Sequence, residues 1–248
     1  AYTVRNTQRA IGTRLSSMVV GRFDTQILQP DHITLRLRGS AGQSLGAFLV
    51  RGIKIEVLGD CNDYVGKGLS GGIITVRPRP SSKLIPHQNT IIGNTVLYGA
   101  TAGKLFAAGQ AGERFAVRNC GASTVIEGCG SNGCEYMTGG VAVILGQVGD
   151  NFAAGMTGGM AFVYDENANF SNKVNDESVV YQGVESGYWA LQLRSLIEEH
   201  FAETGSPRAG EILNAWEFEL PKFKQICPKE MLGRLQYPLN DKIAEKVA

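Results

Sequence analysis

A short glycine-rich unit repeats along this chain and limits its fold more than any other feature. The residues Met-Thr-Gly-Gly occupy 137–140 and recur at 156–159, nineteen residues later, and a looser copy, Leu-Ser-Gly-Gly, occupies 69–72. The glycine pairs of these copies are Gly71 and Gly72, Gly139 and Gly140, and Gly158 and Gly159. Self-similarity at a period near 20 residues is typical of a solenoid, in which each unit buries its apolar face only by stacking on its neighbours. We therefore interpret the paired glycines as structural residues.

Short runs rich in β-forming residues recur between glycine-rich corners. They lie at 33–37, 54–58, 73–76, 95–98, 114–117, 141–145, 160–164 and 179–184, and their starts are mostly 17 to 22 residues apart. Each step has room for two or three short strands and tight turns. The sequence predicts an all-β fold, a parallel β-helix of coils about 20 residues long, in which glycine supplies corners that need positive φ or close backbone contact.

One proline-rich stretch interrupts this rhythm. Residues 77–87 hold three prolines and three of the lysines and arginines of the chain. Connecting segments of this kind run over the surface. We expect a loop over 77–92 that leaves the coil, and either simple solvation or a docking role remains open for it.

After residue 185 the pattern becomes helical. Apolar residues from Trp189 to Phe201 recur at the spacing of one face of an amphipathic helix, and Gly205 follows as a stop signal. Ser206 and Pro207 are a typical N-cap and first-turn residue for a second helix.

These patterns predict two parts. Residues 1–185 form the β-helix domain with an N-terminal segment, which includes a weak helical signal at 15–22, and residues 186–248 form a helical hairpin cap and tail. A solenoid exposes apolar edges at its ends, so the hairpin is suited to cover one of them. A grip on a neighbouring domain is the alternative.

Composition excludes several partners. The chain has 24 basic and 23 acidic residues, a net charge of +1, so no overall field attracts nucleic acid or an anionic membrane. No run of about 18 apolar residues and no signal-peptide pattern is present. We expect a soluble protein of the cytoplasm, or of the plastid stroma in a plant or alga. A start at Ala1 suggests a processed or excised chain.

The cysteines indicate reduced thiols. The chain has five, at 61, 120, 129, 134 and 227, and a chain of this length needs no disulfides for stability. Cys120, Cys129 and Cys134 invite comparison with an iron–sulfur site, but their spacings of nine and five residues match no cluster motif. We expect no metal site here.

Two glycine strings match the dinucleotide fingerprint GxGxxG, at 66–71 and 128–133. That fingerprint requires a preceding strand and a following helix whose N-terminus meets the pyrophosphate, and neither string has this context. We expect solenoid corners and no bound nucleotide cofactor.

Acidic and histidine side chains suggest no catalytic group either. Asp60 begins like a calcium loop, but Val65 and Gly71 stand where glycine and glutamate are required, so a turn stabilised by Asx side chains is the better interpretation. Asp60 and Asp63 are the only close acidic pair of the glycine-rich region, and the three histidines at 32, 87 and 200 are scattered.

Several strings closely resemble the C-terminal domain of the glutamate synthase large subunit. They lie at 39–44, 62–72, 97–101, 113–119, 133–140, 151–156 and 204–206, and the resemblance runs from about Asn6 to Pro228. Strings of five or more residues agree in order and spacing, which makes the resemblance specific. Cys120 and Cys129 depart from the family pattern, in which other small residues are usual.

The resemblance implies a right-handed β-helix, the GXGXG-motif domain, that carries no catalytic, cofactor-binding or metal-binding residue. Whole glutamate synthases convert glutamine and 2-oxoglutarate to two glutamates with ammonia from a cysteine amidotransferase domain and an FMN site for reduction. Neither domain, nor a cluster-binding cysteine run, is present in this sequence. We therefore expect FMN and an iron–sulfur cluster elsewhere, and a scaffold role toward the amidotransferase and synthase domains as partners, in the same chain or as separate subunits.

Two rivals remain. The β-helical subunit of formylmethanofuran dehydrogenase resembles this domain, but it should lack the long helical tail and the Thr-Gly-Ser string at 204–206. A free-standing β-helix carbohydrate-active enzyme is disfavoured, because the coils from 114 to 145 carry few acids.

Overall fold

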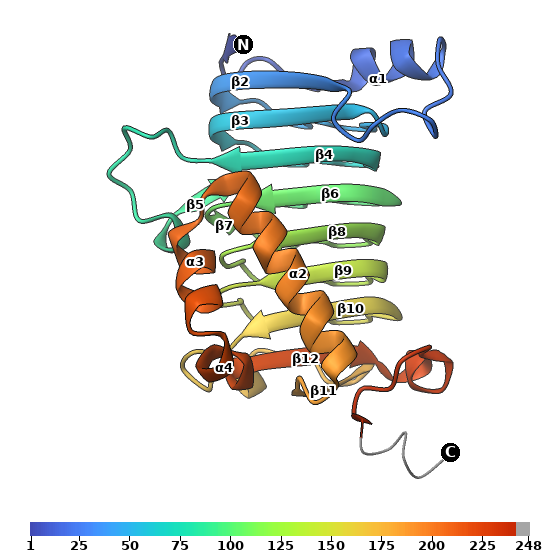
Figure 1. The fold of residues 1–248 in the computed structure, drawn as a ribbon, viewed down its shortest axis with the longest axis vertical. Helices are drawn as coiled ribbons and strands as arrows, with labels where there is room; N and C mark the ends of the chain where they lie inside the picture. Colours follow the sequence, from blue (N-terminus) through green and yellow to red (C-terminus); the bar gives the residue numbers. More distant parts are fainter. Residues whose placement is uncertain (242–248) are drawn as a thin grey trace.

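The chain folds into a β-solenoid whose parallel strands stack in chain order. In the computed structural model, which describes residues 1–241, the solenoid has about seven turns (Figure 1). Its parallel strands are β1 (Tyr2–Val4), β2 (Ile33–Ala41), β3 (Ile53–Cys61), β4 (Ser70–Arg77), β6 (Ala102–Ala107), β8 (Cys120–Ile126), β9 (Thr138–Ile144) and β10 (Gly158–Tyr164). Two shorter strands, β5 (Thr90–Ile92) and β7 (Gln110–Ala111), pair with each other, and β5 also pairs with β3. The predicted all-β solenoid is confirmed.

Strand register decides which side chains enter the core. Ile55 of β3 lies beside Ile74 of β4, and Ile74 lies beside Leu105 of β6. All three side chains are fully buried inside the coils, while their sequence neighbours point outward, because successive residues of a strand face opposite sides. Each such aliphatic side chain stabilises the fold by about 2 kcal/mol relative to an exposed one. Apolar rows therefore run the length of the solenoid.

Two expected strands are wrong. Residues 95–98 and 114–117 are turns, in which Leu97 has a φ of 60° and Ala116 a φ of 56°. These angles lie in the left-handed region, outside the β region. Apolar residues of both segments, such as Leu97 and Ala116, are buried in the turns, and an apolar run of this length also predicts a short strand. The true strands of these coils, β6 and β8, begin with small residues and were missed.

Left-handed residues recur in each coil as a set of three at alternate positions. The sets are Ser44, Gly46 and Phe48; Tyr64, Gly66 and Gly68; Thr95, Leu97 and Gly99; Arg114, Ala116 and Arg118; Asn132, Cys134 and Tyr136; and Asn151, Ala153 and Gly155. In the fourth set, Arg114 donates its backbone N–H to Ser131 of the next coil at 2.9 Å, and Ala116 donates to Val96 of the previous coil at 3.0 Å. The turns thus stack through backbone hydrogen bonds without forming strands.

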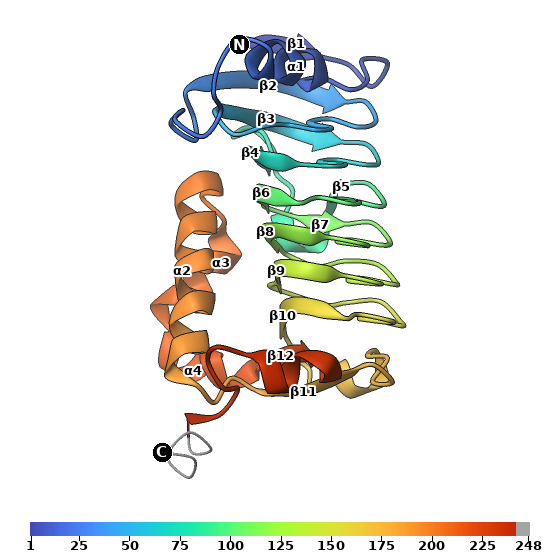
Figure 2. The same ribbon diagram turned by 90° about the vertical axis from the view of Figure 1, so that its right-hand side faces the viewer.

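Helices run along the solenoid and do not cover its end. α2 (Gly187–Thr204), α3 (Pro207–Asn214) and α4 (Trp216–Glu219) follow the last coil, and the predicted stop at Gly205 and N-cap at Ser206 are confirmed. α2 contacts β4, β6, β8 and β9, and Figure 2 shows it beside the sheet, with the turns between strands stacked on the opposite side. The expectation that this hairpin covers an end of the solenoid was wrong.

Strands cover that end instead. β12 (Phe223–Pro228) pairs antiparallel with β10, and on its other side with β11 (Val179–Gly183), the strand predicted at 179–184. β12 follows the helices in sequence but belongs to the same sheet. The division of the chain at 185 and 186 therefore stays a prediction.

The remaining elements are short. α1 (Thr13–Val20) confirms the helix expected at 15–22. Short 3-10 helices are η1 (Pro86–Gln88), η2 (Phe170–Asn172), η3 (Leu220–Lys222) and η4 (Lys229–Arg234). The predicted loop begins after β4 and contains η1 and β5. Within residues 1–241, no helix has the length and apolar character needed to cross a membrane.

A second apolar cluster fills the space between the helices and the outer face of the sheet. On one row of that face, Thr75, Phe106 and Val125 lie side by side in register, and Val143 and Phe162 continue the row. Helix residues including Leu193, Ile197 and Ile212 pack on this row. On the strands before β4 the same row consists of Arg36 and Glu56. The outward residues become apolar where the helices cover them.

Candidate interaction surface

The structure places the six glycines named from the repeats at the starts of β4, β9 and β10, where the strand ladders shift register. Gly71, Gly140 and Gly159 have φ values of 121°, 82° and 81°. Residues with a side chain rarely adopt such angles, because the Cβ collides with the backbone.

The other three glycines lie close to the preceding coil. A Cβ on Gly139 would collide with the backbone oxygen of Cys120, and one on Gly158 would collide with that of Thr138. A Cβ on Gly72 would lie 2.6 Å from Cγ of Leu49. At these positions a side chain has no space because the strands of successive coils approach each other.

The two glycine strings at 66–71 and 128–133 form turns of the solenoid. The first leads into β4 and the second into the turn before β9, so neither string precedes a helix. A phosphate group would meet no helix N-terminus at either position. The geometry differs from that of a dinucleotide site.

The cysteines are free thiols, and Cys120 is the exposed one. Burial raises the pKa of Cys129 to about 12 and that of Cys227 to about 11. Burial also raises the pKa of Cys61 and of Cys134. Across residues 1–241, no three His, Cys, Asp or Glu side chains are grouped as metal ligands. The described residues therefore do not fit an iron–sulfur cluster.

The turn at 60–63 bonds its own backbone, as expected for Asx side chains. Oδ1 of Asn62 accepts the N–H of Asp63 at 2.7 Å, and Oδ1 of Asp63 accepts the N–H of Asn94 from the next coil at 2.8 Å. Asp60 accepts the hydroxyl of Ser40 at 3.0 Å. The side chains of Asn62 and Asp63 thus stabilise the turn, and Asp60 joins β3 to β2.

The histidines lie on separate elements. His32 precedes β2, His87 lies in η1, and His200 lies in the last turns of α2. Only His200 is fully buried. The structure therefore does not bring them together.

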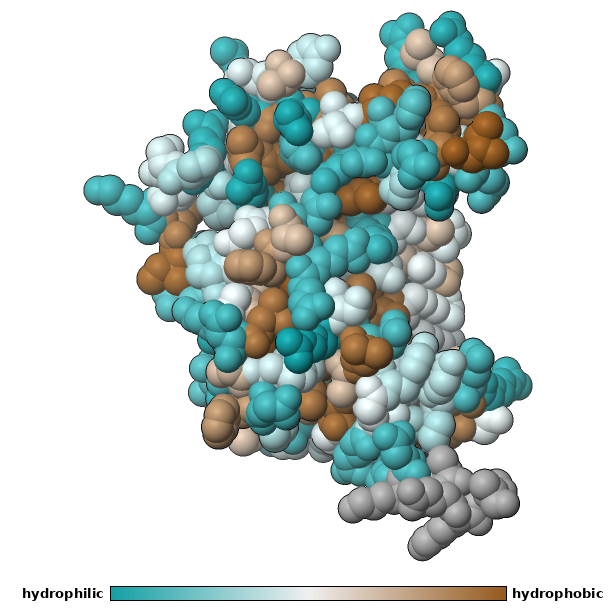
Figure 3. Space-filling model, viewed as in Figure 1, coloured by the Kyte–Doolittle hydropathy of each residue, from teal (hydrophilic) through white to brown (hydrophobic). Residues whose placement is uncertain are grey.

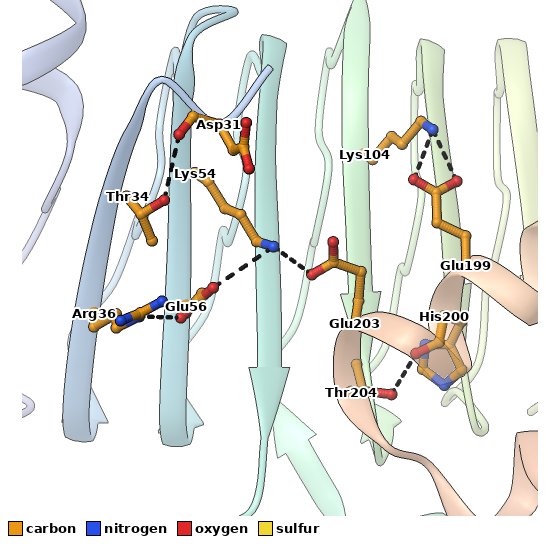
Figure 4. A network of polar contacts seen from close by, with 10 residues as sticks. All are labelled: Asp31, Thr34, Arg36, Lys54, Glu56, Lys104, Glu199, His200, Glu203 and Thr204. Carbon is orange, nitrogen blue, oxygen red and sulfur yellow. Dashed lines mark hydrogen bonds and ion pairs between the residues drawn. The ribbon is translucent and has the colours of Figure 1, made fainter. Parts of the chain in front are cut away.

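Two ion pairs join α2 to the sheet (Figure 4). Nζ of Lys104 on β6 lies 2.7 Å and 2.8 Å from the two carboxylate oxygens of Glu199. Nζ of Lys54 on β3 lies 2.6 Å from Glu203, one helical turn further, and 3.6 Å from Glu56. The side chain of Lys54 is only 13% exposed. Partly buried pairs of this geometry hold a helix in one position, and no sequence pattern indicates them, because their partners are far apart along the chain.

A buried polar cluster lies between the solenoid and the turn from α2 to α3. Glu127, the residue after β8, accepts a hydrogen bond from the hydroxyl of Ser206, and its Oε1 lies 3.7 Å from Nε2 of His200. Ser206 also accepts the N–H of Ala209 at 3.0 Å as the N-cap of α3. Among residues 1–241, Oε2 of Glu127 and both ring nitrogens of His200 have no hydrogen-bond partner. A buried carboxylate is costly without its donors, so this cluster fixes the helical layer to the coil.

A similar contact anchors α4. The Tyr164 hydroxyl of β10 donates to Glu219, and Nζ of Lys222 lies 2.7 Å from the same carboxylate. Burial and the bond to Glu219 raise the pKa of Tyr164. The helical layer is thus tied to the sheet by polar contacts near β3, β6, β8 and β10.

Beside α2 the starts of the strands stay uncovered. Figure 3 shows a pale strip there, next to the helix, where residues have intermediate hydropathy. A hollow of about 480 Å³ opens on this strip, lined among others by Ser70, Gly71, Gly103 and Gly121, with Arg51 at its side. The strip offers a contact surface made largely of small residues.

Comparison with known proteins places this architecture in a family. Residues 1–229 match the family model described as GXGXG motif. The chain belongs to the GXGXG motif family. Glycines at alternate positions give this motif its name, and in this GXGXG domain Gly66 and Gly68 occupy alternate left-handed positions of one turn.

Relatives of this GXGXG domain are much longer proteins. It is 70% identical over 240 residues to the glutamate synthase (NADPH) large chain of Azospirillum brasilense, which covers 97% of this chain and 16% of that protein. It is 50% identical over 227 residues to the ferredoxin-dependent glutamate synthase of Pyropia yezoensis, covering 92% of this chain and 15% of the relative. For the glutamate synthase (NADH) of Schizosaccharomyces pombe the identity is 48%, covering 94% of this chain and 12% of the relative. The relatives therefore contain other domains.

Proposed function

We propose that this GXGXG domain is the solenoid of a glutamate synthase large chain and acts there as a non-catalytic scaffold. The observation that carries the proposal is the 70% identity over 97% of the chain. In this proposal glutamine, 2-oxoglutarate and a reductant become two glutamates in an amidotransferase domain and an FMN-binding synthase domain outside these residues. FMN and an iron–sulfur cluster belong to those domains, and the enzyme works in the cytoplasm or in plastids. The relatives named above are all glutamate synthases, which supports this function over the two rivals.

The build of the domain supports a scaffold role. Its coils are joined by strand ladders on one side and by the bonds between left-handed turns on the other. Two apolar clusters fill the coils and the space under the helices. Coils that are hydrogen-bonded to their neighbours on both sides form a stiff body. A stiff body can keep two bound domains at a fixed separation.

A first experiment addresses the absence of catalysis. The purified 248-residue chain is expected to be colourless, without flavin absorption near 450 nm, and to hydrolyse no glutamine. A full-length large chain, assayed in parallel, serves as the positive control. Bound flavin or measurable glutaminase turnover in the short chain would overturn the proposal.

A second experiment addresses the partners. Affinity capture with the separately produced synthase and amidotransferase domains is expected to retain this chain. Absence of binding to both would count against the scaffold role.

A further inference from the structure

The outer surface of the first coils, at strands β2 to β4 and the loop after β4, carries a group of cations without acidic partners. We name as the basic edge the three arginines Arg38 of β2, Arg77 at the end of β4 and Arg79 two residues further. All three are exposed, and within residues 1–241 none forms an ion pair or a side-chain hydrogen bond. In a chain with a net charge of only +1, this is a local concentration of positive charge.

Strand register aligns the first two arginines. Arg38 lies beside Leu58 of β3, and Leu58 lies beside Arg77. All three side chains point to the same outer face of the sheet, because residues in register share a face. Adjacent strands are about 4.8 Å apart, so the two arginines stand about 10 Å apart with an apolar residue between them.

The acids near the basic edge already have partners. Glu56 pairs with Arg36 at 2.8 Å, and Glu203 pairs with Lys54 at 2.6 Å. Asp60 accepts the hydroxyl of Ser40. The carboxylates beside Arg38 and Arg77 are thus ion-paired, and these two arginines are free to bind carboxylates from outside. Asp60 lines the hollow of Arg79 and forms no ion pair within residues 1–241.

Two hollows flank the basic edge. One, of about 320 Å³, is lined by Arg38, Leu58 and Arg77 among others. The other, of about 370 Å³, lies under the loop after β4 and is lined by Arg79 together with apolar residues such as Pro86 and Ile91. On the same loop Leu84 and Ile85 are 58% and 50% exposed. Arginine and exposed aliphatic side chains around a hollow are typical of a surface that binds protein.

We propose that the basic edge docks an acidic protein segment of another domain of the large chain, with carboxylates about 10 Å apart that bind Arg38 and Arg77. The proposal rests on the proposed function, since it assigns that partner to the longer chain. Nucleic acid is disfavoured, because three unpaired cations beside paired acids form too small a field and the loop offers aliphatic groups. The loop that interrupts the repeat thereby gains a role, as one wall of the docking surface.

Zero-length cross-linking in the full-length large chain tests this docking. Arg38→Lys and Arg77→Lys keep the charge and introduce an amine, which a carbodiimide joins only to a carboxylate in contact with it. Arg118→Lys is the matched control, because Arg118 is also exposed and has no ion pair among the described residues, but lies on the turn side of the solenoid. Mass spectrometry is expected to find residues 38 and 77 joined to aspartate or glutamate outside this domain. The yield should fall at least several-fold in 0.5 M salt, because the pairing is electrostatic.

Charge reversal gives the second arm. Arg38→Glu with Arg77→Glu should abolish the cross-links that the native Lys83 on the same loop forms to that segment, and reversing the identified acids to lysine should restore contact. Cross-links confined to this domain, or none, would overturn the proposal. Binding of millimolar inorganic phosphate to both arginines, without any cross-link to another domain, would also overturn the proposal, because the edge would then be a small-anion site. None of these readouts depends on glutamate formation, so the proposed function can fail or stand separately.

Discussion

The buried carboxylate of Glu127 accepts a hydrogen bond from the hydroxyl of Ser206, which lies 79 residues further along the chain. This contact joins the residue after β8 to Ser206, the N-cap residue of α3. It is one of the polar contacts that bind the helical layer to the solenoid, beside the ion pairs of Lys54 and Lys104.

Ser206→Ala should destabilise the protein by about 2–3 kcal/mol, because it removes an N-cap and leaves a buried carboxylate without its donor. Urea denaturation measures the change. Ser81→Ala, at an exposed serine, is the control and should change the free energy of unfolding by less than about 0.5 kcal/mol. A double-mutant cycle with Glu127→Gln should show coupling between the two sites, and simple additivity would contradict the contact.

Gly158→Ala should cost about 3 kcal/mol or prevent folding, since its Cβ would meet the backbone of the previous coil. Gly183→Ala is the matched control, because a Cβ at Gly183 meets nothing within 4 Å. That control should be neutral or slightly stabilising. Thermal unfolding compares the two variants, and equal effects would show that close approach is not the reason for glycine at 158.

Arg118→Gly should keep or raise stability by up to about 1 kcal/mol, because Arg118 has a φ of 53° and glycine adopts this angle without strain. Arg118→Val should lower the stability by about 1–2 kcal/mol, since branching at Cβ makes the left-handed region worse. Thr34→Gly, in the extended backbone of β2, is the control and should be destabilising. Calorimetry that ranks the glycine variants the other way would contradict the left-handed turn.

The stability of the first turn of α2 should depend on pH. Oδ2 of Asp241 accepts the N–H of Gly187 at 2.8 Å, and this bond lowers the pKa of Asp241 below the ordinary carboxyl value. The stabilisation is therefore complete above the unfolded pKa and is lost as the pH falls through the lower folded pKa. The protection factors of amide hydrogen exchange in the first turn of α2, which correct for the intrinsic pH dependence of exchange, should fall in that range, and Asp241→Ala should remove this loss of protection. An unchanged profile in the variant would contradict the contact.

One thiol should react rapidly in the native protein. Four cysteines are buried and Cys120 is exposed, so a thiol reagent at pH 8 should modify one group quickly and all five after unfolding. Cys120→Ser should remove the fast phase. A fast phase that persists in this variant would mean that a buried thiol becomes accessible in the folded state.

Much of the solenoid could be predicted because each coil repeats local rules. Paired glycines at 139 and 158 stand at corners where the register shifts, and apolar runs such as 160–164 lie in strands as expected. The failures at 95–98 and 114–117 have one cause. A left-handed turn with a buried middle residue such as Leu97 has the same apolar composition as a short strand, and its backbone angle depends on bonds to coils before and after it.

The sequence by itself determined the period, the kind of fold and the family, because these depend on the spacing of residues along the chain, which the sequence contains in full. Only the tertiary structure decided where the helices lie. Their apolar face fits the end of a solenoid as well as its side, and the choice follows from rows such as Phe106 and Val143, whose neighbours in space come from different coils. The same is true of Glu127, Lys104 and the basic edge, since pairing or isolation of a charge is a property of residues that meet only after the coils have stacked.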